Sequence, residues 1–203
     1  MSNGTNVKKR NGSIEPLNLE KIHNMCEEAC EGLAGVSASQ VEIQSGIQFY
    51  DGITTAEIQE ILIRSASDLI TLDNPNYQYV ASRLLLFSVR KSLYGRLREL
   101  PTLEEHIVSC VSQEVYDPDI YNKYSLEEIR KADGFLDHGR DFLFTYAGLR
   151  QVVDKYLVQD RSGGGVYETP QFMYIMIALT IFAEYPNCLL YTSDAADDCW
   201  RVD

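Results

Sequence analysis

The stretch VKKRNGSIEPLNLEKI, from Val7 to Ile22, decides how this chain begins to fold. An Asn11-Gly12 pair between two short runs predicts a tight hairpin with a two-residue turn, because both central residues must tolerate positive φ. The run then enters a helix for which Asn18 is the expected N-cap. A basic hairpin that leads into a helix N-terminus can bind an anion, since free N–H groups and the helix dipole favour negative charge. A solvated hairpin without a ligand is the alternative that these residues leave open.

Composition narrows the classes of protein that fit. The chain has 203 residues and a net charge of −12, so a general affinity for nucleic acid or for an anionic membrane is not expected. The longest apolar run, Pro170 to Ala183, is shorter than the roughly 20 residues that span a bilayer, which indicates a buried helix. None of the five cysteines forms a Cys-x-x-Cys pair, and the start carries no cleavable signal pattern. We therefore expect a cytoplasmic protein whose side chains bind no metal.

Helical signals dominate the first half. Apolar spacing predicts a helix over residues 19–33 and a second that starts after Ser37 or Ser39 and stops near Asp51. Thr54 and the glutamate three residues later form a capping box that opens a third helix. A fourth helix is predicted from about Tyr77 to Tyr94.

The second half is also mainly helical. Residues 102–150 read as helices joined by turns, with a second capping box at Ser125 and Glu128. The glycine-rich stretch 161–165 predicts a hairpin turn and not a phosphate loop, because no Lys-Ser/Thr follows it. Pro170 suits the first position of the apolar helix.

The quoted N-terminal stretch resembles the opening of an ATP-cone domain. Four further stretches are similar to the large (alpha) subunit of class I, aerobic ribonucleoside-diphosphate reductase of bacteria and phages: SQVEIQSGIQFYDGITTAEI, DNPNYQYVASRLLLF, DHGRDFLFTYAGLRQ and KYLVQDRSGGGVYETPQFMY. The resemblance covers about residues 6–186. It implies a mainly α fold with short β-hairpins, in which a hairpin and four helices form a cone over residues 1–95. Residues 96–187 are then the helical start of a ten-stranded α/β barrel domain.

The string CLLYTSDAADD, from Cys188 to Asp198, looks like translated sequencing-library adapter. We therefore predict that residues 188–203 are a non-native tail and that the reductase frame is cut short near Asn187. Cys188, Cys199 and Trp200 carry no functional argument for the same reason.

The family reduces ribonucleoside diphosphates to deoxyribonucleoside diphosphates by thiyl-radical chemistry. The resemblance places the catalytic cysteines beyond this chain, and Cys26, Cys30 and Cys110 match no catalytic position. The fragment is therefore expected to hold no catalytic residue and to be inactive alone. The family's partners are a second large subunit and a small radical-generating subunit.

The resemblance does imply an allosteric site for ATP, with Mg²⁺, or for the inhibitor dATP. Lys9 and Lys91 match phosphate-binding lysines, Thr55 matches a threonine at a helix start, and the run from Glu15 to Lys21 matches the segment around base and ribose. Each has a plain alternative, as an exposed charge pair, a helix cap or a solvated lysine. The expected site residues are Lys9, Glu15, Pro16, Leu17, Asn18, Leu19, Glu20, Lys21, Thr55 and Lys91.

Two positions depart from the family pattern. Relatives that respond to dATP carry histidines where this chain has Gln59 and Ser88, so we predict a cone that binds ATP but is weakly inhibited by dATP. Two other classes remain open from the residues alone. One is a stand-alone nucleotide-sensing cone regulator, which would need a zinc ribbon that this chain lacks, and the other is a helical interaction domain without a ligand.

Overall fold

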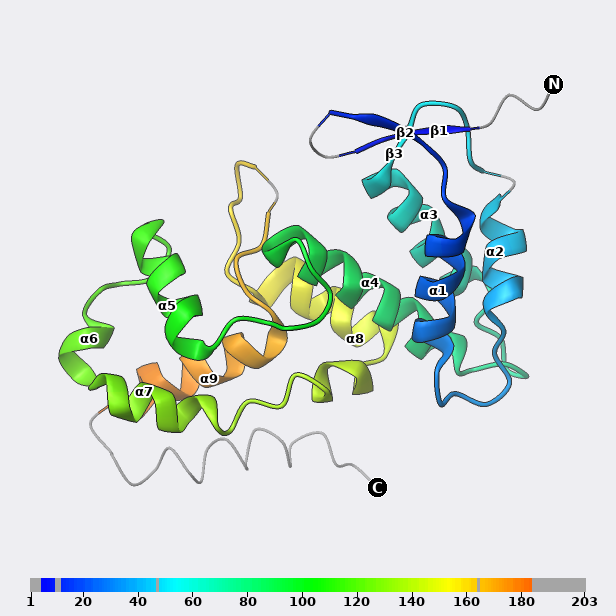
Figure 1. The fold of residues 1–203 in the computed structure, drawn as a ribbon. Helices are drawn as coiled ribbons and strands as arrows, with labels where there is room; N and C mark the ends of the chain where they lie inside the picture. Colours follow the sequence, from blue (N-terminus) through cyan, green and yellow to red (C-terminus); the bar gives the residue numbers. More distant parts are fainter. Residues whose placement is uncertain (1–4, 10–11, 47, 164, 184–203) are drawn as a thin grey trace. The chain divides into compact units, whose positions relative to one another are not determined.

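A computed structural model describes residues 5–9, 12–46, 48–163 and 165–183 of the chain. The fold is mainly helical with one small sheet, which confirms the predicted fold class (Figure 1). Contacts divide the chain into two compact units. The first unit is Met1–Val89 with Phe142–Gln151, and the second is Arg90–Asp141 with Val152–Asp203. The predicted boundaries at residues 95 and 187 stay predictions, and the predicted tail, 188–203, lies outside the described residues.

The sheet of the first unit has three short strands in the order β2-β1-β3. β1 (Asn6–Lys8) pairs antiparallel with β2 (Ile14–Pro16), which confirms the predicted hairpin. The prediction of a two-residue turn in this hairpin is wrong, however. The Lys9 N–H donates to the Ser13 carbonyl and the Gly12 N–H to the Lys9 carbonyl, so the loop is longer and Gly12 supplies its positive φ of 83°.

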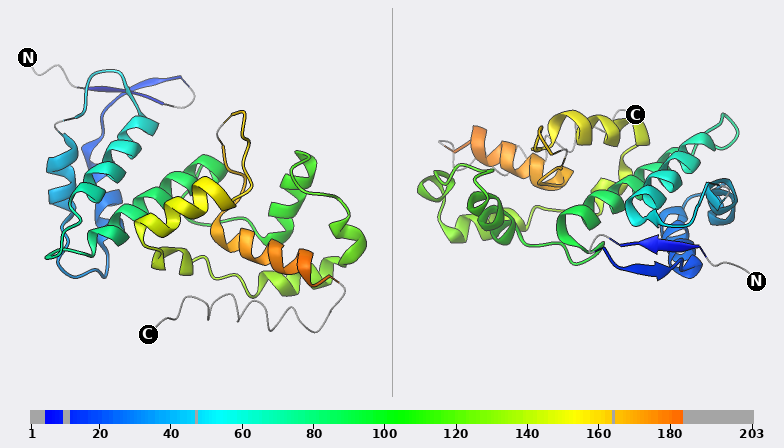
Figure 2. Two further views of the ribbon diagram at one scale, coloured as in Figure 1. Left: turned by 180° about the vertical axis from the view of Figure 1, so that it is seen from behind. Right: turned by 90° about the horizontal axis from the view of Figure 1, so that it is seen from above.

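The third strand was not expected. β3 (Ile53–Thr54) runs parallel to β1, with Val7 beside Ile53 and Lys8 beside Thr54. A strand of two residues is too short to produce a recognisable alternation of apolar and polar residues in the sequence. Figures 1 and 2 show the sheet at one end of the first unit's helices, where α3 begins.

Local signals set most helix limits in the first unit. α1 (Leu19–Cys30) has Asn18 as its N-cap, as predicted, but it ends before Leu33. Its end is fixed from outside, because Arg83 Nη1 donates to the carbonyls of Ala29 at 3.1 Å and Glu31 at 2.6 Å. The remaining helices are α2 (Ala38–Gly46), α3 (Thr55–Asp68), α4 (Tyr77–Tyr94) and α8 (Tyr146–Gln151).

The predictions for α3 and α4 are confirmed, and the predicted end of α2 is wrong. The limits of α4 and the capping box of α3 are confirmed. α2 ends at Gly46 and not near Asp51, because the chain turns there, with the Gln48 N–H donating to the Ser45 carbonyl. α4 continues from the first unit into the second.

The second unit is built from helices of different lengths. They are α5 (Leu103–Ser112), α6 (Ile120–Lys123), α7 (Leu126–Asp133), the 3₁₀ turn η1 (Arg140–Leu143, shared with the first unit), the π-helical turn η2 (Val152–Tyr156) and α9 (Pro170–Ile181). Pro170 opens α9 as predicted. The Gln159–Val166 bridge confirms a hairpin around the glycine-rich turn.

Apolar side chains of α5, α7 and α9 form the core of the second unit. Phe172 is fully buried among Leu103, Ile107 and Ile129. Its ring stacks on His106 with centroids 4.0 Å apart and meets the edge of His138 at 4.9 Å. Among the described residues, no helix is both long and apolar enough to cross a membrane.

Candidate functional site

The sheet of the first unit brings together two stretches that lie far apart in the sequence. Because β3 pairs with β1, Lys8 lies beside Thr54, and Lys9 follows at the point where α3 begins. The basic strand is therefore aligned with a helix N-terminus, where unpaired N–H groups and the dipole favour an anion. A carboxylate fixes one end of β1, since Asp51 Oδ1 accepts from the Asn6 N–H at 2.7 Å and from Asn6 Nδ2 at 3.0 Å.

Lys9 and Glu15 face each other across the hairpin. The Lys9 Nζ lies 3.1 Å from Glu15 Oε2, and both side chains are partly open to solvent, at 34 % and 52 %. An ion pair this exposed is weak and can exchange for another partner. Lys9 is therefore positioned by the hairpin and still accessible to a ligand.

The run from Pro16 to Lys21 leads from β2 into α1. The Leu17 N–H donates to the Thr5 carbonyl at 2.8 Å, and Asn18 Oδ1 accepts from the Lys21 N–H at 3.0 Å. Asn18 therefore already caps the helix. The other members of this run, Pro16, Leu19, Glu20 and Lys21, are exposed at the surface.

The start of α3 is held by a reciprocal set of hydrogen bonds. Thr54 Oγ1 accepts from the Glu57 N–H at 3.1 Å, and Glu57 Oε2 accepts from the Thr54 N–H at 2.8 Å. The Tyr50 hydroxyl donates to the other carboxylate oxygen at 2.8 Å. The bonds from Thr54, then from Tyr50, lower the pKa of Glu57, so this carboxylate is charged at neutral pH. Thr55 is the first residue of the helix.

Two family models match this chain. The ATP cone domain matches residues 5–92, and the all-alpha domain of ribonucleotide reductase matches residues 142–201. The second match includes most of the predicted tail, whose origin stays a prediction.

Curated relatives point the same way. The chain is 49 % identical over 181 residues to ribonucleoside-diphosphate reductase 1 subunit alpha of Escherichia coli, across 89 % of this chain and 24 % of that protein. It is 46 % identical over 187 residues to the alpha subunit of Haemophilus influenzae, across 92 % and 25 %. The alpha subunit of Enterobacteria phage T4 is 39 % identical over 183 residues, across 89 % and 24 %.

The chain belongs to the ribonucleoside-diphosphate reductase alpha-subunit family. It spans about a quarter of the length of the curated relatives that it matches. These relatives are reductase subunits and not stand-alone regulators, so the alternative of a separate nucleotide sensor is not supported.

The expected effector residues of this chain all lie within the range that matches the cone. The structure brings Lys9, Glu15 and Thr55 to one small sheet. Lys91 is an exposed residue in the last turn of α4 and belongs to the second unit. The role of Lys91 in effector binding stays a prediction.

Gln59, one of the two departures from the family pattern, points inward. It is 4 % exposed, and its Nε2 donates to Met25 Sδ at 3.4 Å, which links α3 to α1. In this structure the Gln59 amide is therefore packed between α1 and α3. Ser88 is half-buried on α4.

The cysteines of the described part, Cys26, Cys30 and Cys110, are free thiols with raised pKa values. Burial raises the pKa to about 12 for Cys26 and about 11 for the other two. No group of three or more metal-ligating side chains occurs among the described residues.

The second unit contains one buried group of charged side chains, whereas its other ion pairs, such as Arg130–Glu104, are exposed. Arg90 Nη2 lies 3.3 Å from Asp141 Oδ2 and donates to the His138 carbonyl at 2.6 Å. The two charged side chains are only 6 % and 0 % exposed. Nearby, the Tyr116 hydroxyl donates to the buried carboxylate of Glu168 and also meets His106 Nε2 at 3.1 Å. These groups are internal to the unit.

Proposed function

We propose that this chain is the effector-binding N-terminal part of a ribonucleoside-diphosphate reductase and that its cone binds ATP as an activator. The complete enzyme would reduce ribonucleoside diphosphates to deoxyribonucleoside diphosphates, with catalytic cysteines supplied by the part that this chain lacks. The observation that carries the proposal is the β1–β3 pairing, which aligns the basic strand with the start of α3 inside the range that matches the ATP cone.

The residues of the first unit suit a triphosphate. Lys9 offers an ammonium group beside the N-terminal end of α3, and Thr55 offers a hydroxyl and a backbone N–H there. Lys21 adds a second exposed ammonium group in the first turn of α1. Together these groups would hold the phosphates, while the run from Glu15 to Lys21 would contact the ribose and base.

A direct test is calorimetric titration of the full chain with ATP and Mg²⁺. We expect saturable binding, and Lys9→Ala should weaken it about tenfold, the worth of one hydrogen bond to a charged group. Lys131→Ala is the control, because Lys131 is an exposed lysine of α7 that pairs with Glu127 at 3.3 Å. Absence of heat at millimolar ATP would contradict the proposal, and so would equal weakening by the control substitution.

We also propose that dATP inhibits this enzyme weakly, because Gln59 and Ser88 replace the histidines of responsive relatives. The inward orientation of Gln59 supports the idea. The test is a dose-response of the complete reductase with dATP. Strong inhibition at micromolar dATP would refute it.

The partners of the complete enzyme are part of the same proposal. We expect two alpha subunits to pair and to work with a small radical-generating subunit in the cytoplasm. The three free thiols of the described part are consistent with a reducing compartment. Co-purification of the complete alpha subunit with its small subunit tests the assembly.

A further inference from the structure

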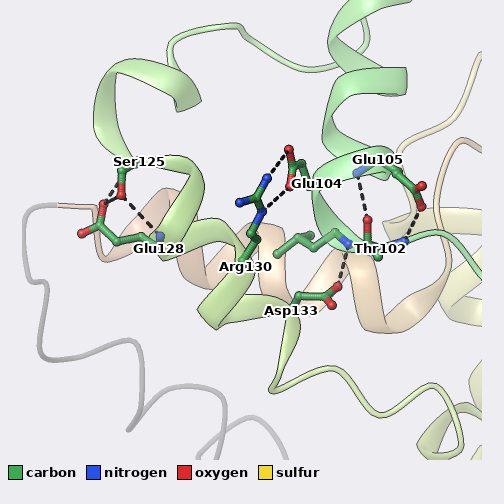
Figure 3. Close-up of polar contacts among 8 residues, drawn as sticks. Thr102, Glu104, Glu105, Ser125, Glu128, Arg130 and Asp133 are labelled. Atoms are coloured by element: carbon green, nitrogen blue, oxygen red, sulfur yellow. Dashed lines mark hydrogen bonds and ion pairs between the residues drawn. The ribbon is translucent and has the colours of Figure 1, made fainter.

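Within the part of the chain that the structure describes, three helices begin with the same capping box. Thr54 and Glu57 open α3, Thr102 and Glu105 open α5, and Ser125 and Glu128 open α7. In each, a carboxylate accepts from the N-cap N–H at 2.8 to 2.9 Å, and the N-cap hydroxyl accepts from the glutamate N–H at 3.1 to 3.3 Å. Figure 3 shows the boxes of α5 and α7 (Figure 3). The three boxes are therefore nearly identical in local geometry.

The box of α3 stands at the candidate effector site. Thr54 belongs to β3 and lies beside Lys8 of β1. Glu57 also accepts a hydrogen bond from Tyr50, a contact for which the other two boxes have no counterpart among the described residues. This carboxylate is exposed and ionised, since its hydrogen bonds lower its pKa. A fixed negative charge therefore already sits where the N-terminus of α3 would meet a phosphate.

At Lys9, too, a positive group of the site is paired with a protein carboxylate. The Lys9 ammonium group is paired with the Glu15 carboxylate. Both the cation and the helix start thus have a protein carboxylate as partner. An incoming triphosphate must share or displace these partners, and it is repelled more strongly as its own charge increases.

We propose that Glu57 is a specificity-determining residue of the effector site, whose fixed charge disfavours free ATP and selects the less negative Mg²⁺ complex. The inference rests on the proposed function, because it needs ATP to bind beside α3. Glu57 is not assigned a direct contact with the nucleotide. It acts through the charge that it holds at the start of α3.

The test compares nucleotide affinity of full-chain Glu57→Gln with and without Mg²⁺. Glutamine can still make the capping box, so the substitution removes the charge and keeps the helix start. We expect the affinity for free ATP to rise about fivefold and that for the Mg²⁺ complex about twofold, because an exposed charge a few ångströms away acts through water and salt, where one pair of unit charges changes a binding constant by about fivefold. Glu57→Asp keeps the charge and should not tighten binding of free ATP.

Glu128→Gln and Glu105→Gln are the matched controls, since they change the same box in the second unit. Both should alter thermal stability as Glu57→Gln does, without the gain in affinity for free ATP. Equal affinity of wild type and Glu57→Gln for free ATP would overturn the inference and leave the proposed function intact. Selective weakening of the Mg²⁺ complex would also overturn it, because Glu57 would then be a metal ligand. Absence of ATP binding by the wild-type chain would overturn both.

Discussion

One ion pair from each unit shows two opposite environments. In the first unit, the Lys9–Glu15 pair lies at the surface of a small sheet and is half open to solvent. The second unit encloses the Arg90–Asp141 pair, of which neither side chain is more than 6 % exposed. An exposed pair can exchange its partner for a ligand at little cost, whereas a buried pair loses several kcal/mol when one partner is removed. The difference separates a surface suited to an effector from an interior that maintains a fold.

The largest effect that should follow from this comparison lies in the core of the second unit. Phe172→Ala removes a fully buried ring that packs on both His106 and His138. We expect the free energy of unfolding to fall by about 3–5 kcal/mol in urea denaturation. Phe135→Ala is the control, because that ring is 39 % exposed and its loss should cost much less. Similar losses for both would contradict the assigned core.

Removal of the buried cation should come next. Arg90→Met leaves the Asp141 carboxylate buried without its partner, at a cost of about 3 kcal/mol. Arg130→Met is the control, since Arg130 pairs at the surface with Glu104 at 2.7 Å and its loss should change little (Figure 3). Equal costs for the two substitutions would remove the contrast between buried and exposed pairs.

The cost of Arg90→Met should also depend on pH. Burial raises the pKa of Asp141 to about 7, although Arg90 opposes the rise. An unfolded aspartate loses its proton near pH 4, so the folded chain binds more protons between about pH 4 and 7, and its stability falls as pH rises through that window. Without Arg90 the pKa of Asp141 rises further, so the pH range over which stability falls extends to higher pH. Urea denaturation should therefore show a larger cost at pH 8 than at pH 6, and a pH-independent cost would contradict this account.

Helix capping offers a smaller effect that should be equal in both units. Thr54→Ala and Ser125→Ala each remove the hydroxyl of a capping box, and each should cost about 1 kcal/mol in urea denaturation. A much larger cost for Thr54→Ala would show that its hydroxyl also supports the β1–β3 pairing. That result would sharpen the contrast between the two boxes.

Two histidines provide the smallest test. His23 Nδ1 lies 2.8 Å from Glu42 Oε1 and its Nε2 lies 3.3 Å from Glu27 Oε1, and the bond to Glu42 chiefly raises its pKa. This contribution to stability is complete below about pH 6.5 and is lost as pH rises through the folded pKa. NMR titration should show Glu42→Gln lowering the pKa of His23. Buried His106, with a pKa lowered to about 4, should not titrate in that range, and a matching response of the two rings would refute the assignment.

Features with a local cause were predictable from the sequence. The hairpin, the Asn18 cap, the Thr54 and Ser125 capping boxes and the start of α9 at Pro170 each depend on residues within a few positions of one another. The Thr102–Glu105 box has the same signal and was overlooked.

Features that depend on distant residues were not predictable in this way. The β1–β3 pairing, the Arg83 contacts that end α1 and the Arg90–Asp141 pair each join segments far apart in the chain. No periodicity encodes them. The resemblance to the reductase family identified the expected site residues. The fold then showed that Lys9 is aligned with Thr55. The contacts of these residues with a nucleotide stay predictions.

The parallel pairing of Val7 with Ile53 also has a consequence for biosynthesis. α1 and α2 lie between these two residues in the chain, so the sheet closes only after both helices have left the ribosome. Domains form from the N-terminus as the chain emerges, and long-range strand pairings are among the last contacts to be made. A nascent chain that stops before Ile53 therefore presents the hairpin without its third strand, and affinity for a triphosphate should appear only after β3 and the start of α3 have emerged.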